Sequence, residues 1–238
     1  MATNVESTMT DLMTSLAIVF IMLMFAFMQN QGVEANQGST KKLDAIQESL
    51  AVVLEPLNLG CVDDVNDPLA CIIRLPDEQL KFKVNKADID PQGKVFLSQL
   101  IPGMVRELTS ETHREHVESM FINGFTDSDG DDEMNLQLSQ ARAFSVGKHI
   151  VGPILNKPEF IKASGQRHSP RDTVIDWLHL NGRGERELQY VDCGQTNCPE
   201  NKKASRRVEI KIRVKSHEQR KLIEQQMNAE SAMNENVV

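Results

Sequence analysis

One carboxylate, Asp11, lies at the start of a stretch that carries no other charge up to residue 28. On a helix, Thr14 and Ser15 would share a face with Asp11, because residues three and four positions apart are neighbours on a helix surface. A carboxylate in this position can cap the helix, lie in interfacial water, or carry an ion through a protein-lined path. The shared polar corner favours the third interpretation, with Asp11 as the ion-translocating group and Thr14 and Ser15 as channel-lining candidates.

Residues 127–142 hold a second group of side chains that could bind a ligand. Asp127 offers an anion for an ammonium group, and Arg142 offers a planar guanidinium that suits a carboxylate. By residue type alone, the two could equally form an ion pair with each other. Five acidic residues between 127 and 133 are of the type that binds calcium, but their spacing misses the EF-hand pattern. We expect no metal, no cofactor and no catalytic residue, because no nucleophile and base stand in a typical arrangement.

The element that must hold Asp11 is predicted to be a single transmembrane helix over residues 10–28. Nineteen residues make a helix of about 28 Å, enough to cross the hydrocarbon core of a bilayer. The stretch lacks the polar stripe of a soluble amphipathic helix. A cleaved signal peptide is the alternative, but no Lys or Arg precedes the apolar run and no small-residue cleavage site follows it.

The four cysteines all follow the apolar stretch and form two close pairs in the sequence, Cys61 with Cys71 and Cys193 with Cys198. Local disulfides are typical of oxidising compartments, so we predict a periplasmic C-terminal domain and a short cytoplasmic N-terminus over residues 1–9. Reduced thiols are the alternative, and neither pair has the spacing of a good zinc site. The net charge of −8 argues against a nucleic-acid partner.

Beyond the apolar stretch, the sequence predicts a linker and connecting helix over 29–56, a domain over 57–215 and a tail over 216–238. The linker is expected to be flexible over 29–40, and the tail to fray into disorder. Helical and period-two patterns alternate as β-α-β-α-β, which predicts an α+β two-layer sandwich. The predicted strands are 71–75, 80–82, 116–124 and 207–214, and the predicted helices are 42–54, 92–108, 135–151 and 171–180. The inner side of helix 135–151 is expected to carry Leu138, Ala141, Phe144, Ser145 and Ile150.

Three blocks occur in this order along the chain: Ile122-Asn-Gly-Phe-Thr-Asp127, Asn135-Leu-Gln-Leu-Ser-Gln-Ala-Arg-Ala143 and Arg206-Arg-Val-Glu-Ile210. Together they resemble the OmpA-like peptidoglycan-binding domains, although Phe125 departs from the His or Tyr common there. The resemblance implies that Asp127 binds the ammonium of diaminopimelate in the stem peptide and that Arg142 binds a carboxylate. It also implies that Asn135 at the helix start helps to hold an anionic group. The same site would include Thr126, Met134, Leu138, Arg206 and Arg207.

With the N-terminal helix added, the chain resembles the MotB class of ion-driven stator subunits, and within it the ZorB family of the Zorya anti-phage defence system. The opening Thr10-Asp-Leu-Met-Thr14, the short non-basic N-terminus and the segment inserted before Arg206 carry this resemblance. It implies an inner-membrane homodimer inside a ring of polytopic ZorA-like (MotA-like) subunits, with Asp11 carrying H⁺ or Na⁺ and the domain held by peptidoglycan. The output would reach cytosolic defence effectors indirectly. The alternatives are a flagellar MotB-type stator and a structural tether without ion flow.

Overall fold

The computed structural model describes residues 3–83, 86–161, 169–193, 198–219, 221–223 and 225, with side chains of the first helix described over 13–25 and from residue 38 onward. The chain divides into two compact units, Met1–Thr40 with Ser216–Val238, and Lys41–Lys215. The second, called the globular unit below, contains the sheet and both disulfides.

The first unit contains most of α1 (Thr3–Leu54), the helix that includes the predicted membrane segment. Between residues 13 and 25 each large apolar side chain is more than half exposed, and Thr14 and Ser15 are also exposed. The side chain of Asp11 lies outside the described residues. Across the part of the chain that the structure describes, we find no helix with both the length and the apolar content needed to cross a membrane.

The sequence predicts a flexible linker over residues 29–40, but in the structure α1 continues through these residues. Gln, Glu and Ala in this stretch are good helix formers, and each of its two glycines costs only about 1 kcal/mol relative to alanine. From Lys41 onward, the helix belongs to the globular unit and buries Leu43, Ile46 and Leu50. The apolar period of the predicted connecting helix therefore marks the part of α1 that packs into the core.

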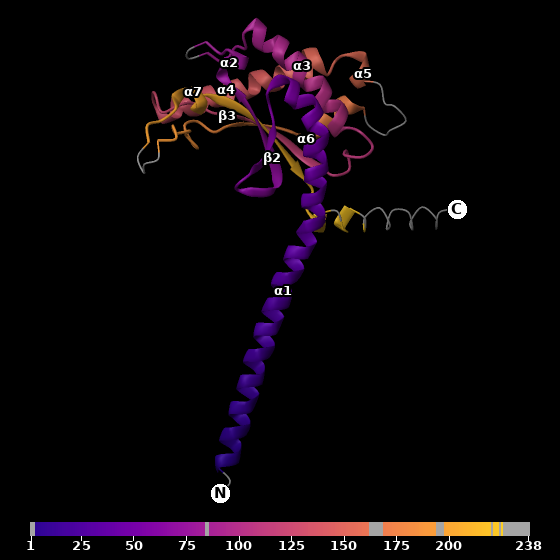
Figure 1. Cartoon of the computed structure of the whole chain (residues 1–238), viewed down its shortest axis with the longest axis vertical. Helices are drawn as coiled ribbons and strands as arrows, with labels where there is room; N and C mark the ends of the chain where they lie inside the picture. The colour runs from indigo at the N-terminus through magenta and orange to yellow at the C-terminus, as the bar shows by residue number, and fades with distance from the viewer. Residues whose placement is uncertain are drawn as a thin grey trace, which may run out of the picture. The chain divides into compact units, whose positions relative to one another are not determined.

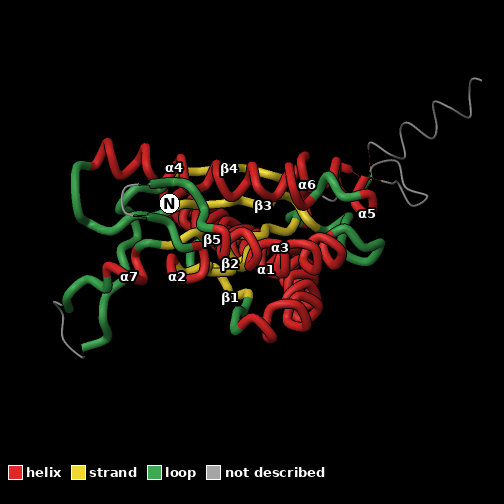
Figure 2. The backbone as a smooth tube through the Cα atoms, turned by 90° about the horizontal axis from the view of Figure 1, so that it is seen from above, coloured by secondary structure: helices red, strands yellow, loops and turns green. Residues whose placement is uncertain are grey.

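Five strands form one mixed sheet in the order β1-β2-β5-β3-β4 (Figure 2). Neighbouring strands are antiparallel except β3 and β4, which run parallel. Alternation along the central strand sends Val208, Ile210 and Ile212 into the core and turns Glu209 and Lys211 to the other face. The strands are β1 (Cys61–Asp64), β2 (Asp67–Pro76), β3 (Val117–Gly124), β4 (Leu178–Gly182) and β5 (Arg207–Val214).

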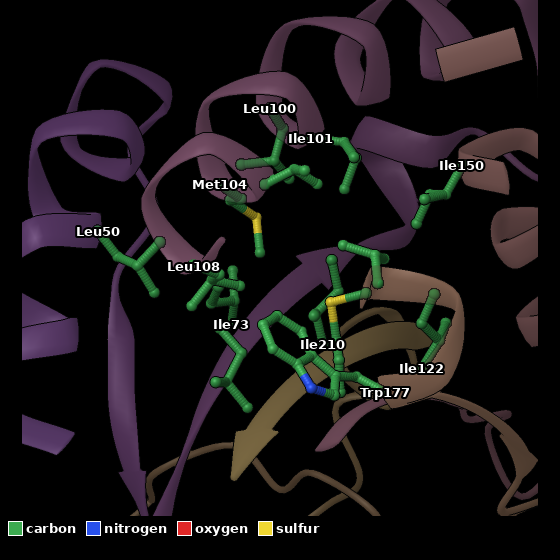
Figure 3. Packing of buried hydrophobic residues seen from close by; sticks show 14 of the residues in the cluster. Leu50, Ile73, Leu100, Ile101, Met104, Leu108, Ile122, Ile150, Trp177 and Ile210 are labelled. Atoms are coloured by element: carbon green, nitrogen blue, oxygen red, sulfur yellow. The ribbon is translucent and has the colours of Figure 1, made fainter. Parts of the chain in front are cut away.

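Helices α3 and α4 lie over one face of the sheet, which makes the two-layer α+β arrangement (Figure 1). Side chains of α3, including Met104 and Leu108, pack with Ile73, Ile122 and Ile210 of the sheet in one core (Figure 3). Each such fully buried aliphatic side chain contributes about 1.5–3 kcal/mol. The remaining elements are η1 (Glu55–Leu57), α2 (Asp77–Leu80), α3 (Pro91–Leu108), α4 (Asp132–His149), η2 (Ile150–Ile154), α5 (Pro158–Ile161), α6 (Pro170–Trp177) and α7 (Lys202–Ser205).

Short elements account for most of the differences from the sequence prediction. Strand β1 pairs with β2 across a tight turn, and β4 starts where helix 171–180 was expected to continue. The predicted strand 80–82 is wrong, because Leu80 ends α2 and Lys81 has a left-handed backbone with φ of 53°. A left-handed residue cannot continue an extended strand.

The predicted inner side of helix α4 is only partly right: Ile150, just after the helix, is buried and Leu138 and Ser145 are half-buried, but the other two residues are not. Phe144 is 56% exposed and Ala141 is exposed, whereas Ser139 and Ala143 are buried. Small residues on the inner side let the helix approach the strands closely. A Cβ atom on Gly124 of β3 would lie 2.2 Å from the carbonyl oxygen of Ser139. Close approach at Gly124 and the burial of Val146 together set the side of α4 that faces the sheet.

Candidate functional site

The end of β3 and the start of α4 are joined by an acidic loop that the helix cap holds in place. The loop begins after Gly124 and ends at Asp131, whose Oδ1 accepts hydrogen bonds from the backbone N–H groups of Glu133 (2.9 Å) and Met134 (3.3 Å). The fixed loop sets where Asp127 lies relative to Arg142, which comes from the third turn of α4. Both residues line one hollow, called the cleft below.

The cleft has a volume of about 220 Å³ and brings together most of the residues predicted from the OmpA-like motifs. It includes Thr126, Asp127, Asn135, Leu138, Arg142 and Arg206. Met134 is 64% exposed and does not line the cleft. Arg207 also lies outside the cleft, since it is buried in a separate ion pair.

Arg206 connects two carboxylates of the cleft. Its Nη1 donates a hydrogen bond of 2.6 Å to Oδ2 of Asp127, and its Nε lies 3.6 Å from Oδ2 of Asp77. Burial alone would lower the pKa of Arg206, but the hydrogen bond and charge of Asp127, with the charge of Asp77, raise it overall. The guanidinium is therefore held firmly between the two acids.

Arg142 is the deepest charge in the cleft, with only 3% of the residue exposed. Its Nε donates to the carbonyl oxygen of Lys86 (3.2 Å), and its guanidinium carbon lies 5.1 Å from the centroid of the Phe82 ring. Burial lowers the pKa of Arg142, and the charges of Asp77 and Asp127 only partly compensate. An arginine stays charged at neutral pH all the same, so the cleft holds a desolvated cation.

Two acceptor atoms in the cleft are buried and have no hydrogen-bond partner among the described residues, Oδ1 of Asp77 and Oγ1 of Thr126. Burial raises the pKa of the Asp77 carboxyl, against the lowering effect of the Arg142 and Arg206 charges. Buried polar groups are usually satisfied in native proteins. Acceptors left open beside a desolvated guanidinium are what a site for a charged, hydrogen-bonding ligand requires.

Side chains from other parts of the globular unit form hydrogen bonds and an ion pair with the loop that carries Asp127. The Asn135 amide donates to the carbonyl oxygen of Asp129 (3.1 Å) and to Glu185 (3.1 Å), so in this structure it ties the acidic loop down. Glu200 accepts hydrogen bonds from the backbone and hydroxyl of Ser128, and Lys202 pairs with Asp129. Asp129 is therefore committed to a structural partner, and the loop that carries Asp127 is held in place.

Arg207 and Phe125 explain one departure from the family pattern. The Arg207 guanidinium lies 3.9 Å from the centroid of the Phe125 ring and donates from Nε to Glu209 (2.7 Å). Phe125 is 1% exposed, so its ring serves as packing for this ion pair and does not reach the cleft. A ring without a polar group is compatible with this position, because the ring is buried and the Arg207 guanidinium lies against it.

Sequence reasoning missed three residues that line the cleft, Asp77, Phe82 and Asp129. Asp77 directly follows β2, whose last residue, Pro76, pairs with Arg207 of β5. This pairing brings Asp77 beside Arg206, and its N–H donates to the Arg206 carbonyl (3.3 Å). No local pattern signals that contact, because it depends on the register of two strands far apart in the sequence.

Both predicted disulfides are confirmed. Cys61–Cys71 joins β1 to β2, and Cys193–Cys198 closes a short loop in the segment that leads to Glu200 and Lys202. Cys71 is completely buried in the core.

No protein-family model matches the chain. Over 214 residues it is 26% identical to the Zorya protein ZorB of Escherichia coli O139:H28 (strain E24377A / ETEC), covering 85% of this chain and 77% of that protein. The two proteins are distant homologues. Their matched region is longer than the globular unit, so the similarity to ZorB extends beyond residues 41–215.

Solved structures that resemble the fold come from periplasmic and OmpA-like domains. The periplasmic domain of Helicobacter pylori MotB has a TM-score of 0.45 at 17% identity and covers 72% of this chain and 87% of its own. The OmpA-like domain of FopA1 from Francisella tularensis subsp. tularensis SCHU S4 gives 0.36 at 14%, with 66% and 82% covered. The peptidoglycan-associated lipoprotein from Burkholderia pseudomallei gives 0.34 at 17%, with 56% and 86% covered. At these identities, the ligand has to be argued from the cleft and the sequence motifs.

Proposed function

We propose that this chain is a ZorB-like, ion-driven stator subunit whose globular unit is an OmpA-like domain that binds peptidoglycan through the cleft. The observation that carries the proposal is that Asp127 and buried Arg142 line one hollow, together with acceptor atoms that have no partner among the described residues. The three OmpA-like sequence blocks meet at this hollow. The distant homology to ZorB adds the context of an anti-phage defence complex.

The chemistry of the stem peptide matches the cleft. Diaminopimelate carries an ammonium and a carboxylate on one short carbon chain. Arg142 can bind the carboxylate through its guanidinium, and Asp127 can accept hydrogen bonds from the ammonium. Oγ1 of Thr126 can accept a further hydrogen bond or donate one, because its hydroxyl has no partner among the described residues. The apolar stem of the diamino acid would lie against Leu138.

Co-sedimentation with purified peptidoglycan sacculi tests this binding. We expect Asp127→Asn and Arg142→Met each to weaken binding about tenfold or more, since each removes a charged hydrogen-bonding partner. Arg186→Gln is the matched control, because Arg186 is exposed and does not line the cleft. Retention of full affinity in both cleft variants, with all proteins folded, contradicts the proposal.

For the N-terminal part, we propose a single-pass inner-membrane anchor in which Asp11 carries protons (or Na⁺) within a ring of polytopic MotA-like subunits around a dimer. The uncharged sequence over 12–28 and the exposed apolar side chains over 13–25 support the anchor. The two disulfides support a periplasmic location for the globular unit. Membrane potential would supply about 2.3 kcal/mol for each charge that crosses 100 mV.

Asp11→Asn separates this motor from its alternatives. The motor requires that the variant lose phage defence while its expression and its binding to sacculi persist. A structural tether without ion flow predicts full function for the same variant. Rescue of a flagellar motility mutant by the chain would favour the flagellar stator, and co-purification in detergent followed by mass measurement would show the partner ring or its absence.

A further inference from the structure

In this structure, the carboxylate of Asp127 already has a charged partner, Arg206. Nη1 of Arg206 donates a hydrogen bond of 2.6 Å to Oδ2 of Asp127, which is shorter than the 3.6 Å contact of Arg206 with Asp77. A ligand ammonium that binds the same oxygen of Asp127 therefore competes with this guanidinium and can replace it. Such an exchange is favourable only if the displaced guanidinium finds another acid, because an unpaired charge in a partly buried hollow is costly.

Asp77 is placed to be that acid. Its Oδ2 lies 3.6 Å from Nε of Arg206, and its Oδ1 is buried with no hydrogen-bond partner among the described residues. The backbones of the two residues are already joined, since the Asp77 N–H donates to the Arg206 carbonyl. Rotation of the Arg206 side chain alone can thus move its guanidinium from Asp127 to Asp77.

We propose that Asp77 is a positioning residue that accepts Arg206 when the ammonium of a ligand displaces it from Asp127. The proposal rests on the proposed function, in which the ligand brings one ammonium and one carboxylate. After the exchange, Asp127 faces the ammonium, Asp77 faces Arg206, and Arg142 faces the ligand carboxylate. Each charge then has a partner of opposite sign, and Asp77 itself does not contact the ligand.

A double-mutant cycle on the full-length protein in detergent tests the exchange. The variants are Asp77→Asn, Arg206→Gln and the double variant, and the readout is the affinity for a muropeptide that contains diaminopimelate, measured by titration calorimetry. We expect Asp77→Asn to weaken binding about tenfold in the wild-type background. In the Arg206→Gln background the same substitution should change affinity by less than about twofold, because no guanidinium remains to be accommodated.

Two results would overturn the proposal. Equal losses from Asp77→Asn in both backgrounds would mean that Asp77 contacts the ligand or supports the fold, and no loss in either would mean that Arg206 needs no second partner. Thermal unfolding of each variant separates a folding defect from a binding defect, and Asp77→Ser provides a second test if Asn impairs folding. Failure of the wild type to bind any muropeptide would instead remove the proposed function, and this proposal with it.

Discussion

Two hollows of equal volume, about 220 Å³ each, differ in how their charges are satisfied. One is the cleft. The other, called the open-face hollow, lies on the sheet face that points away from the core and is lined by residues such as Asp64, Glu209 and Lys211. There, Lys211 pairs with Asp64 (2.7 Å) and Asp67 (3.0 Å), and Arg213 pairs with Asp67 (3.0 Å) and with Glu118. In the cleft, by contrast, two buried oxygens, Oδ1 of Asp77 and Oγ1 of Thr126, have no partner among the described residues.

A cluster of charges by itself therefore does not distinguish the proposed ligand site; among the described residues, the unpartnered buried oxygens of Asp77 and Thr126 set the cleft apart from the open-face hollow. The consecutive residues Arg206 and Arg207 show the contrast within one strand start. Arg206 is about one-third exposed and bridges two acids of the cleft, while Arg207 is 4% exposed and is committed to Glu209. We expect variants of the cleft to lose ligand affinity and variants of the open face to lose stability.

The largest expected effect comes from Arg207→Gln. Removing one member of a buried ion pair leaves Glu209, 3% exposed, with the longer contact to Arg74 at 3.4 Å as its one remaining ion pair among the described residues. We predict a loss of about 3 kcal/mol or more in the free energy of unfolding, measured by urea denaturation. Arg206→Gln is the matched control and should lose about 1 kcal/mol or less. Equal losses of unfolding free energy in the two variants would contradict the difference proposed between the open face and the cleft.

The next effect concerns the disulfide that ties β1 to β2 and so holds Asp64 and Asp67 of the open face. Replacing Cys61 and Cys71 with serine opens a loop of ten-residue separation and should cost about 2–3 kcal/mol in unfolding free energy. Ligand affinity should stay within about twofold of the wild type, because neither cysteine lines the cleft. A parallel fall in muropeptide affinity would show that the two regions are coupled.

A smaller, pH-dependent effect is expected at Asp67. Burial alone would raise the pKa of its carboxyl, but the hydrogen bond from Lys211, the Leu69 N–H and the charges of Lys211 and Arg213 lower it overall. A lowered folded-state pKa stabilises the protein above the unfolded value and is lost as the pH falls through the folded value. Asp67→Asn should therefore cost about 1 kcal/mol at pH 7, and the difference should disappear as the pH falls below the lowered pKa of Asp67. A cost that persists in acid would contradict this assignment.

The smallest expected effect on stability is that of Asp77→Asn, which should stabilise the protein slightly, whereas Asp67→Asn should destabilise it. Because burial raises the pKa of this carboxyl, its ionisation at neutral pH opposes folding, and the stability of the native state should rise as the pH falls through that pKa. Asp77→Asn should give a slightly higher melting temperature than the wild type at pH 7, together with the affinity loss argued above. A lower melting temperature would mean that the attraction to Arg142 and Arg206 outweighs burial.

Long, regular elements could be predicted from the sequence, and contacts set by strand pairing could not. Strand β5 and helix α3 follow from strict alternation and from a strong apolar period. Strands β1 and β4 are too short to give a pattern of their own. The inner side of α4 is harder to predict, because small or polar residues such as Ser139 and Ala143 make up much of it and carry little hydrophobic signal.

The site divides in the same way. Asp127 and Arg142 were found because they belong to local sequence blocks at a strand end and in a helix. Asp77 was missed, since only the pairing of β2 with β5 brings it to Arg206. The N-terminal predictions for Asp11, Thr14 and Ser15 stay predictions, because the side chain of Asp11 lies outside the described residues.

The most direct test of the central claim compares two stem peptides that differ in a single group. One carries diaminopimelate, and the other carries lysine, which keeps the ammonium but lacks the side-chain carboxylate. We expect the wild type to bind the diaminopimelate peptide about ten to a hundred times more tightly than the lysine peptide, and we expect Arg142→Met to abolish this preference. Equal affinities of the wild type for the two peptides would contradict it.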